Sequence, residues 1–298
     1  MRKRFTVAIA IIFLGISWQT VGAGQDDRAQ LVSVTRWTVP EMWFGGFSGI
    51  EISEDGTDIV VMSDRSHFGR ARLRRSAGEI VDVELIDQER MLDVWGRPPK
   101  GLLRDAEGLA QIGVGPYYVS FEGQGRLEAF EQPGGKGKSI KAGRVFEKMK
   151  PNGGMEALAL DGQGRLYTLA EEPVGDPKVA QVFRFDGRKW STPFHISRSD
   201  VFKPVGADFG PDGRFYLLER GFNGIAFRSR VRRFTIGPDG FTDETVLFTT
   251  ISGMHDNLEG LTVWKDSNGL IRLTMISDDN FRFVQRTEVV EYVVPKSP

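Results

Sequence analysis

The sequence has no cysteine and only three histidines among 298 residues. These absences exclude disulfides, thiolate catalysis, iron–sulfur clusters and any zinc site that uses cysteine, so a bound metal would depend mainly on oxygen ligands. A strong excess of one charge is also missing, since 39 basic residues stand against 40 acidic ones. This balance argues against a protein built mainly to bind nucleic acid. The 40% of apolar residues is enough for a folded core and excludes general disorder.

The N-terminal residues predict a secretory signal peptide. Basic residues at positions 2–4 precede an apolar run, Phe5 to Trp18, and small residues follow up to Ala23. This order is typical of a signal peptide, and the apolar run is short for a membrane span. We expect residues 1–23 to be removed and residues 24–298 to form one exported domain, periplasmic or secreted, with no membrane span. An uncleaved N-terminal anchor is the alternative.

A repeated unit runs through the rest of the chain. Each unit has an apolar run, a glycine-rich turn and a second apolar run, and Asp-Gly or Asn-Gly steps in the turns favour tight hairpins. The first runs of the five units lie at 47–51, 105–110, 154–159, 204–209 and 257–262. Helical periodicity is nearly absent, so the units are predicted to be built of strands.

The spacing of the units predicts an all-β fold, a β-propeller with five blades. Equivalent positions are separated by 59, 49, 49 and 54 residues, close to the length that a four-stranded blade needs. Two further strand candidates, Leu31–Pro40 and Glu288–Val294, are expected to pair and close the ring, which removes exposed edges. A divergent sixth blade would fit in the long first interval. A β-sandwich or an open array is the alternative fold, and the glycine-rich stretch 132–139 is interpreted as a surface loop.

Acidic residues recur at two positions of the unit. Glu107, Glu156 and Glu259 lie at the start of the first run, where the other two units have Ser48 and Val205. A second set follows the second run: Asp64, Glu122, Glu171, Glu219 and Asp278. In a propeller the innermost strands line a central channel, so equivalent side chains converge on one axis. Such carboxylates repel one another unless they are protonated or share a cation.

This convergence predicts a metal site at the axis. Ca²⁺ accepts six to eight oxygen ligands in flexible geometry and is favoured over Mg²⁺ or Zn²⁺. The predicted metal-ligating residues are Asp64, Glu107, Glu156, Glu259, Asp278 and Asn280. The alternative for each glutamate is a structural role, in which it accepts backbone N–H groups of the neighbouring blade and locks blade to blade.

Four residues next to the acidic positions are candidates for catalysis. Arg65, Arg104 and Arg220 could bind an anionic substrate through bidentate hydrogen bonds, or could simply pair with the neighbouring carboxylates. His255 precedes the last repeated glutamate and is the best general acid–base candidate among the histidines.

Several phrases of the sequence resemble one known family. These are Arg104-Asp-Ala-Glu-Gly-Leu-Ala110, Asn152-Gly-Gly-Met-Glu-Ala-Leu-Ala159, Ala207-Asp-Phe-Gly-Pro-Asp-Gly-Arg-Phe-Tyr-Leu-Leu-Glu-Arg220, and Asn257-Leu-Glu-Gly-Leu-Thr262 with Ile276-Ser-Asp-Asp-Asn280. Together they are similar to the phytase-like family of exported bacterial propellers, also called "esterase-like activity of phytase". The resemblance spans roughly Phe47 to Val294 and implies a β-propeller, hydrolysis of phosphate or other esters, and bound calcium. Ala157 and Asp279 depart from its usual glycine and asparagine.

Two functions follow from the sequence. The first is a Ca²⁺-dependent hydrolase of phosphate or other esters, lactones included, that acts on a small anionic or ester substrate. The second is a non-catalytic periplasmic propeller that binds a ligand or partner, because no nucleophile–base pair can be identified.

Overall fold

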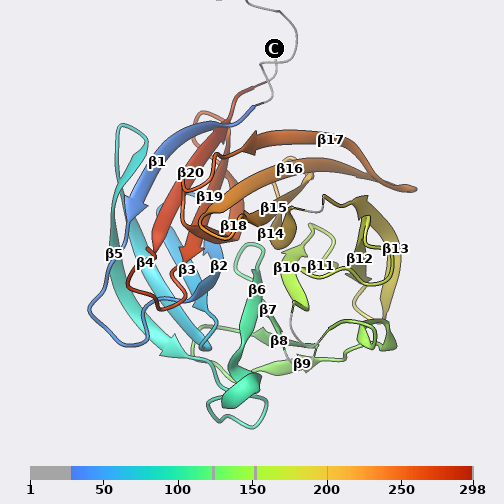
Figure 1. Cartoon of the computed structure of the whole chain (residues 1–298). Coiled ribbons are helices and arrows are strands. Elements are labelled where there is room, and N and C mark those ends of the chain that lie inside the picture. The colour runs from blue at the N-terminus through green and yellow to red at the C-terminus, as the bar shows by residue number, and fades with distance from the viewer. Residues whose placement is uncertain (1–27, 123–124, 151–152, 200, 297–298) are drawn as a thin grey trace, which may run out of the picture.

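Five four-stranded antiparallel sheets surround one axis in the computed structural model, which describes residues 28–122, 125–150, 153–199 and 201–296 (Figure 1). The predicted five-bladed propeller is confirmed. The predicted signal peptide, residues 1–23, lies outside the described residues. Among the described residues, no helix has the length and apolar character that crossing a membrane requires.

The blades follow the chain in order, and each is numbered here by its place. Blade 1 contains β2 (Phe47–Ile52), β3 (Asp58–Ser63), β4 (His67–Ser76) and β5 (Glu79–Arg90). Blade 2 contains β6 (Ala106–Ala110), β7 (Tyr117–Phe121), β8 (Arg126–Phe130) and β9 (Lys138–Ile140). Blade 3 contains β10 (Met155–Leu160), β11 (Leu166–Ala170), β12 (Val179–Phe185) and β13 (Trp190–Ser197).

The last two blades complete the ring. Blade 4 contains β14 (Lys203–Phe209), β15 (Phe215–Phe222), β16 (Phe227–Gly237) and β17 (Gly240–Thr249). Blade 5 contains β18 (Asn257–Lys265), β19 (Ile271–Asp278), β20 (Glu288–Val294) and the N-terminal strand β1 (Gln30–Arg36). Two short 3₁₀ helices, η1 (Gly101–Arg104) and η2 (Arg144–Phe146), precede β6 and β10.

The two ends of the described chain close the ring, as the sequence predicted. β1 pairs antiparallel with β20 from Gln30 opposite Val293 to Arg36 opposite Glu288, and Figure 1 shows the blue strand beside the red one. β20 spans the predicted residues, whereas β1 ends earlier than the predicted Leu31–Pro40. The glycine-rich stretch 132–139 forms most of the connection between β8 and β9, as expected.

Tight turns join the first two strands of every blade. The glycines of these turns have positive φ, a conformation that other residues adopt at a cost: Gly56, Gly113, Gly164, Gly213 and Gly269. The apolar core fills the spaces between neighbouring blades, so that Val205 and Leu218 of blade 4 pack in one cluster with Leu261 and Met275 of blade 5.

Small residues allow the innermost strands to approach one another at the axis. Gly206 of β14 lies against β18, and a Cβ atom at Gly206 would overlap the carbonyl oxygen of Glu259. We therefore expect Gly206→Ala to lower the free energy of unfolding by about 1–3 kcal/mol, the usual cost of overpacking. Chemical denaturation of this variant and of Gly162→Ala provides the check, because nothing lies within 4 Å of a Cβ atom at Gly162. Equal unfolding midpoints for the two variants would contradict the prediction.

Candidate functional site

A β-bulge aims one side chain of each innermost strand at the axis. In all five blades the pairing of the first two strands skips one residue of the first strand. A bulged residue has no direct partner, and the bulge redirects its side chain. The skipped residues are the five equivalent positions of the repeat: Ser48, Glu107, Glu156, Val205 and Glu259.

A second ring of side chains comes from the end of the second strand. In blades 1, 2, 3 and 5 it consists of the predicted Asp64, Glu122, Glu171 and Asp278. In blade 4 the prediction is wrong, because Arg220, and not Glu219, occupies the equivalent place: Arg220 pairs with Lys203 just as Asp278 pairs with Asn257. Since adjacent residues of a strand point to opposite faces, Glu219 points away and forms buried ion pairs with Arg230 and Arg232 instead.

The two rings line one cavity of about 250 Å³ at this end of the axis. Its walls contain seven carboxyl groups and a single guanidinium group, with Ser48 and Asn280 as the neutral members. The lining residues are Ser48, Asp64, Glu107, Glu122, Glu156, Glu171, Arg220, Glu259, Asp278 and Asn280. The structure thus brings together all six predicted metal ligands.

Arg220 neutralises part of the negative charge on one side of the cavity. Its Nη2 donates to Glu171 Oε1 at 2.5 Å, and its Nη1 donates to Asn257 Oδ1 at 3.0 Å and also to Glu259. Burial lowers the pKa of Arg220, but Glu259 and Glu171 more than offset this, so that the pKa is raised. The arginine therefore stays charged and holds blades 3, 4 and 5 together at the axis.

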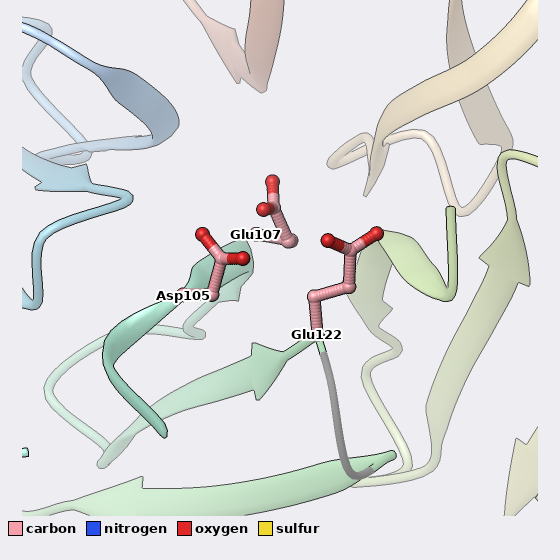
Figure 2. A group of neighbouring side chains, drawn as sticks. All are labelled: Asp105, Glu107 and Glu122. Atoms are coloured by element: carbon pink, nitrogen blue, oxygen red, sulfur yellow. The ribbon is translucent and has the colours of Figure 1, made fainter. Parts of the chain in front are cut away.

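The opposite side of the cavity has an excess of carboxylates. Asp105, Glu107 and Glu122 offer oxygen atoms within 4.8 Å of one another, and Figure 2 shows the three side chains together beside β6. Nearby, the Oδ1 atom of Asp64 is buried and has no hydrogen-bond partner. The sequence prediction included Glu107 and Asp64 but missed Asp105 and Glu122 as ligands.

Burial and, to a smaller extent, mutual repulsion raise the pKa of these groups. Burial raises the pKa of Asp278 to about 9, and the charge of Glu259 adds to this effect. Burial also raises the pKa of Asp64 to about 7, against the opposing effects of Arg65 and Arg104. The pKa of Glu107 is raised well above its usual value by burial and then by Glu156 and Glu259. Carboxyl groups from all blades except blade 4 thus act on one another.

The residues present fit a hard cation. The donor set consists of carboxylate and amide oxygens, which Ca²⁺ prefers, and the buried, unpaired oxygen of Asp64 is the kind of atom that a cation would satisfy. The Asp105–Glu107–Glu122 cluster, in which each residue comes from blade 2, offers three carboxylate oxygens close enough together to share one cation.

Two of the four predicted catalytic residues lie beside the cavity without lining it. Arg65 stacks its guanidinium on the ring of Phe281, 3.1 Å from the centroid. The charges of Arg65 and Arg104 both lower the pKa of Asp64, which places them within electrostatic reach of the site. Arg220 lines the cavity, as described above.

His255 does not line the cavity. Its ring is buried, with Nε2 2.7 Å from the hydroxyl group of Tyr292 on β20, the third strand from the axis. Burial lowers the pKa of His255 to about 4, with a smaller contribution from Arg286, so the ring is neutral at physiological pH. This position does not suit the general acid–base role that the sequence suggested.

We expect His255→Asn to lower stability without a change in any catalytic rate of the cavity. Loss of the ring leaves the buried Tyr292 hydroxyl without its partner, which costs about 1–3 kcal/mol. Thermal unfolding and steady-state kinetics on the same preparation check this, and a large loss of turnover with unchanged stability would restore the catalytic assignment.

The fold and the site define the chain as a five-bladed propeller with an acid-lined cavity at one end of its axis. A model of the phytase-like family, described as "esterase-like activity of phytase", matches residues 42–281. The chain therefore belongs to this family, as the resemblance of its repeated phrases indicated. No curated protein matches the chain.

Solved structures with similar overall shape have low sequence identity to the chain. A protein of unknown function from Dyadobacter fermentans DSM 18053 is 12% identical, with a TM-score of 0.45 over 88% of this chain and 86% of that chain. Streptogramin B lyase is 9% identical, with a TM-score of 0.42 over 89% of this chain and 98% of the other. U3-55K is 9% identical, with a TM-score of 0.45 over 91% and 100% of the two chains.

Proposed function

We propose that this protein is an exported, Ca²⁺-dependent hydrolase of phosphate or other esters. The observation that carries the proposal is the cavity itself, in which seven carboxyl groups converge around one arginine. The family description, esterase-like activity of phytase, supports the same chemistry. Export to the periplasm or medium rests on the signal-like residues 1–23 and places the protein where calcium can be plentiful.

The two sides of the cavity would have different functions in the reaction. Asp105, Glu107 and Glu122 would hold the cation, with Asp64 beside them. When bound, Ca²⁺ would supply positive charge that polarises an ester oxygen and lowers the pKa of water. Arg220 fixes Glu171 and Glu259 opposite this cluster.

Proton transfer would fall to a carboxyl group of the cavity. Groups with raised pKa values hold a proton near neutral pH and can donate it to a leaving group. In the metal-free chain, burial raises the pKa of Asp64 to about 7. A cation on the neighbouring cluster would lower this value, so Asp64 would serve as a base that accepts a proton from water. Arg65 and Arg104, whose charges reach Asp64, would steady an anionic group of the substrate.

A non-catalytic propeller that binds a ligand is the second candidate. Its support is that the cavity-lining residues include no nucleophile–base pair of serine or threonine with histidine, and that Ser48 is their only hydroxyl group. In this case the cation would stabilise the fold and order the rim.

Metal analysis and substrate assays separate the two. The purified protein is expected to contain calcium, and to hydrolyse at least one of p-nitrophenyl phosphate, bis-p-nitrophenyl phosphate, p-nitrophenyl acetate, phytate or a simple lactone. EDTA should abolish the activity and Ca²⁺ should restore it. Bound calcium without turnover of any substrate would favour the binding protein.

A further inference from the structure

Exposed apolar side chains concentrate on the end of the propeller that carries the acidic cavity. Among the described residues, most of the exposed large apolar side chains outside the strands lie in loops at this end. At the opposite end only Ile112 and Val114 of the described loops are of this kind. Exposed apolar groups that gather on one face usually mark a contact surface.

Five of these side chains, together with Phe222 at the end of β15, form what we call the apolar ridge. They come in pairs from the ends of β15, β17 and β19 or the loops that follow, and they are largely open to solvent: Ile225 is 92% exposed, Ile251 76% and Phe283 99%. The ridge consists of Phe222, Ile225, Ile251, Met254, Phe283 and Val284.

Hydrogen bonds join the three loops into one surface. The side chain of Asn223 donates to Ser252 Oγ at 3.2 Å, and the backbone N–H of Gly253 donates to the carbonyl of Phe227 at 2.8 Å. Asp256, at the end of the middle loop, accepts the backbone N–H of Arg286 at 2.9 Å and the amide of Gln285 at 3.2 Å. These hydrogen bonds fix the three segments relative to one another across blades 4 and 5.

Each loop of the ridge also supplies or adjoins a residue of the cavity site. Phe222 follows Arg220 by two residues, and Phe283 follows Asn280 by three. Met254 precedes Asn257, which accepts a hydrogen bond from Arg220, by three residues. The ridge therefore lies at the cavity end of blades 4 and 5, two to three residues along the chain from the residues of the site.

The charges of the two surfaces indicate what would bind across them. The cavity walls contain seven carboxyl groups against one guanidinium, and a single divalent cation leaves carboxyl groups in excess. The segments 222–226, 251–254 and 281–285 that present the ridge contain one charged residue, Arg282, while Asp256, Asp279 and Arg286 lie at the bases of the same loops. A ligand that carries many negative charges would meet repulsion in the cavity and few partners outside it.

We propose that the apolar ridge binds the alkyl or aryl part of the substrate, while the ester or phosphate group of the same molecule enters the acidic cavity. The inference rests on the proposed function and names its substrate class: amphiphilic esters with one polar group and an apolar portion. Burial of successive methylene groups on the ridge would strengthen binding with chain length.

Binding of two non-hydrolysable probes tests the ridge without any turnover. Isothermal titration calorimetry in the presence of Ca²⁺ compares ethylphosphonate with octylphosphonate, and we expect octylphosphonate to bind at least about tenfold more tightly. The variant Ile225→Ser/Ile251→Ser/Phe283→Ser should lose this preference and keep its affinity for ethylphosphonate. Its matched control is Ile112→Ser/Val114→Ser, which removes exposed apolar groups at the opposite end and should behave as wild type.

The outcomes distinguish this inference from the proposed function. A chain-length preference that depends on the ridge, without hydrolysis of any ester, supports the ridge and contradicts the hydrolase. Hydrolysis of esters with no chain-length preference in binding supports the hydrolase and overturns the ridge inference. The inference is also overturned if the serine variant loses only binding to phosphatidylcholine vesicles, or only self-association measured by sedimentation, since the ridge would then serve a membrane or a second copy.

Discussion

Calcium is expected to raise the melting temperature of the protein by about 5–10 °C near pH 8 at a concentration of about 100 times its Kd, and by much less near pH 5. The reason is the crowding of carboxyl groups at the axis. Without a cation, protons and a few neighbouring basic groups must relieve these negative charges. Arg220 already pairs with Glu171 and Glu259, and Arg65 and Arg104 act on Asp64 from beside the cavity.

The pKa values fix the direction of this effect. Asp278 has a pKa of about 9 in the folded chain against an ordinary 3.8, and Asp64 has a pKa of about 7. Because these values are raised, the folded state retains protons that the unfolded state releases. The metal-free protein therefore loses stability as the pH rises from about 4 towards the folded pKa values. Ca²⁺ competes with these protons, so its stabilisation is largest where they have left.

Thermal unfolding of EDTA-treated protein, with and without CaCl₂, measures the effect at several pH values. MgCl₂ at the same concentration serves as a control, because Mg²⁺ gives up its water shell reluctantly and suits a flexible carboxylate site less well. An equal gain at all pH values, or no gain from Ca²⁺, would contradict a cation site made of these carboxyl groups.

Much of the fold could be predicted from the spacing of the repeat. Strands, turns and ring closure follow from local signals, such as the Asp-Gly turns and the β-branched runs, that each blade repeats. The start of β1 and the pairing of β1 with β20 agreed with the sequence, whereas the end of β1 did not, because nothing in residues 37–40 marks where pairing stops.

The sequence predicted both rings of side chains at the axis, but it did not identify every residue in them. Glu219 was chosen over Arg220 because it is acidic, although a count from the second strand gives the correct residue. Asp64, Glu122 and Glu171 each lie five residues after Ile59, Tyr117 and Leu166, and Arg220 lies five after Phe215. The one-residue difference reverses the face of the strand. It replaces the fifth carboxylate expected in this ring with Arg220, the one guanidinium group among the described residues that line the cavity.

The structural role considered for the repeated glutamates, in which a carboxylate locks one blade to the next, belongs to carboxylates at another position of the strand. Blades 1 and 4 have no carboxylate at the bulge, but they have Glu51 and Asp208 three residues further along the same strands. Glu51 accepts the backbone N–H of Gln111 in blade 2 at 2.8 Å, and Asp208 accepts that of Val263 in blade 5 at 2.6 Å. These two carboxylates lock blade to blade near the other end of the channel. Of the bulged glutamates, Glu259 pairs with Arg220, whereas Glu107 belongs to the candidate cation cluster.

Because Glu107 and Glu51 lie at opposite ends of the channel, the same substitution at each tests the cation site directly. Glu107→Gln is expected to weaken Ca²⁺ binding and to lower kcat/KM for any ester that the protein hydrolyses, each by at least about 10–100-fold, the scale seen when partners of a metal site are lost. The amide keeps the size of the side chain but removes a charge and one ligand oxygen from the Asp105–Glu107–Glu122 cluster.

The matched control is Glu51→Gln, the same change on an innermost strand at the opposite end of the channel. Burial and the charge of Asp208 raise the pKa of Glu51, just as burial and neighbouring glutamates raise the pKa of Glu107. Each substitution therefore removes a carboxyl group with a raised pKa. The amide oxygen can still accept the N–H of Gln111, and we expect wild-type Ca²⁺ affinity and turnover from this variant. Calorimetric titration with Ca²⁺ and steady-state kinetics distinguish the pair. Equal losses in both variants would mean that the carboxylates act through the fold as a whole, whereas a loss confined to Glu107→Gln places the cation at the cluster of blade 2.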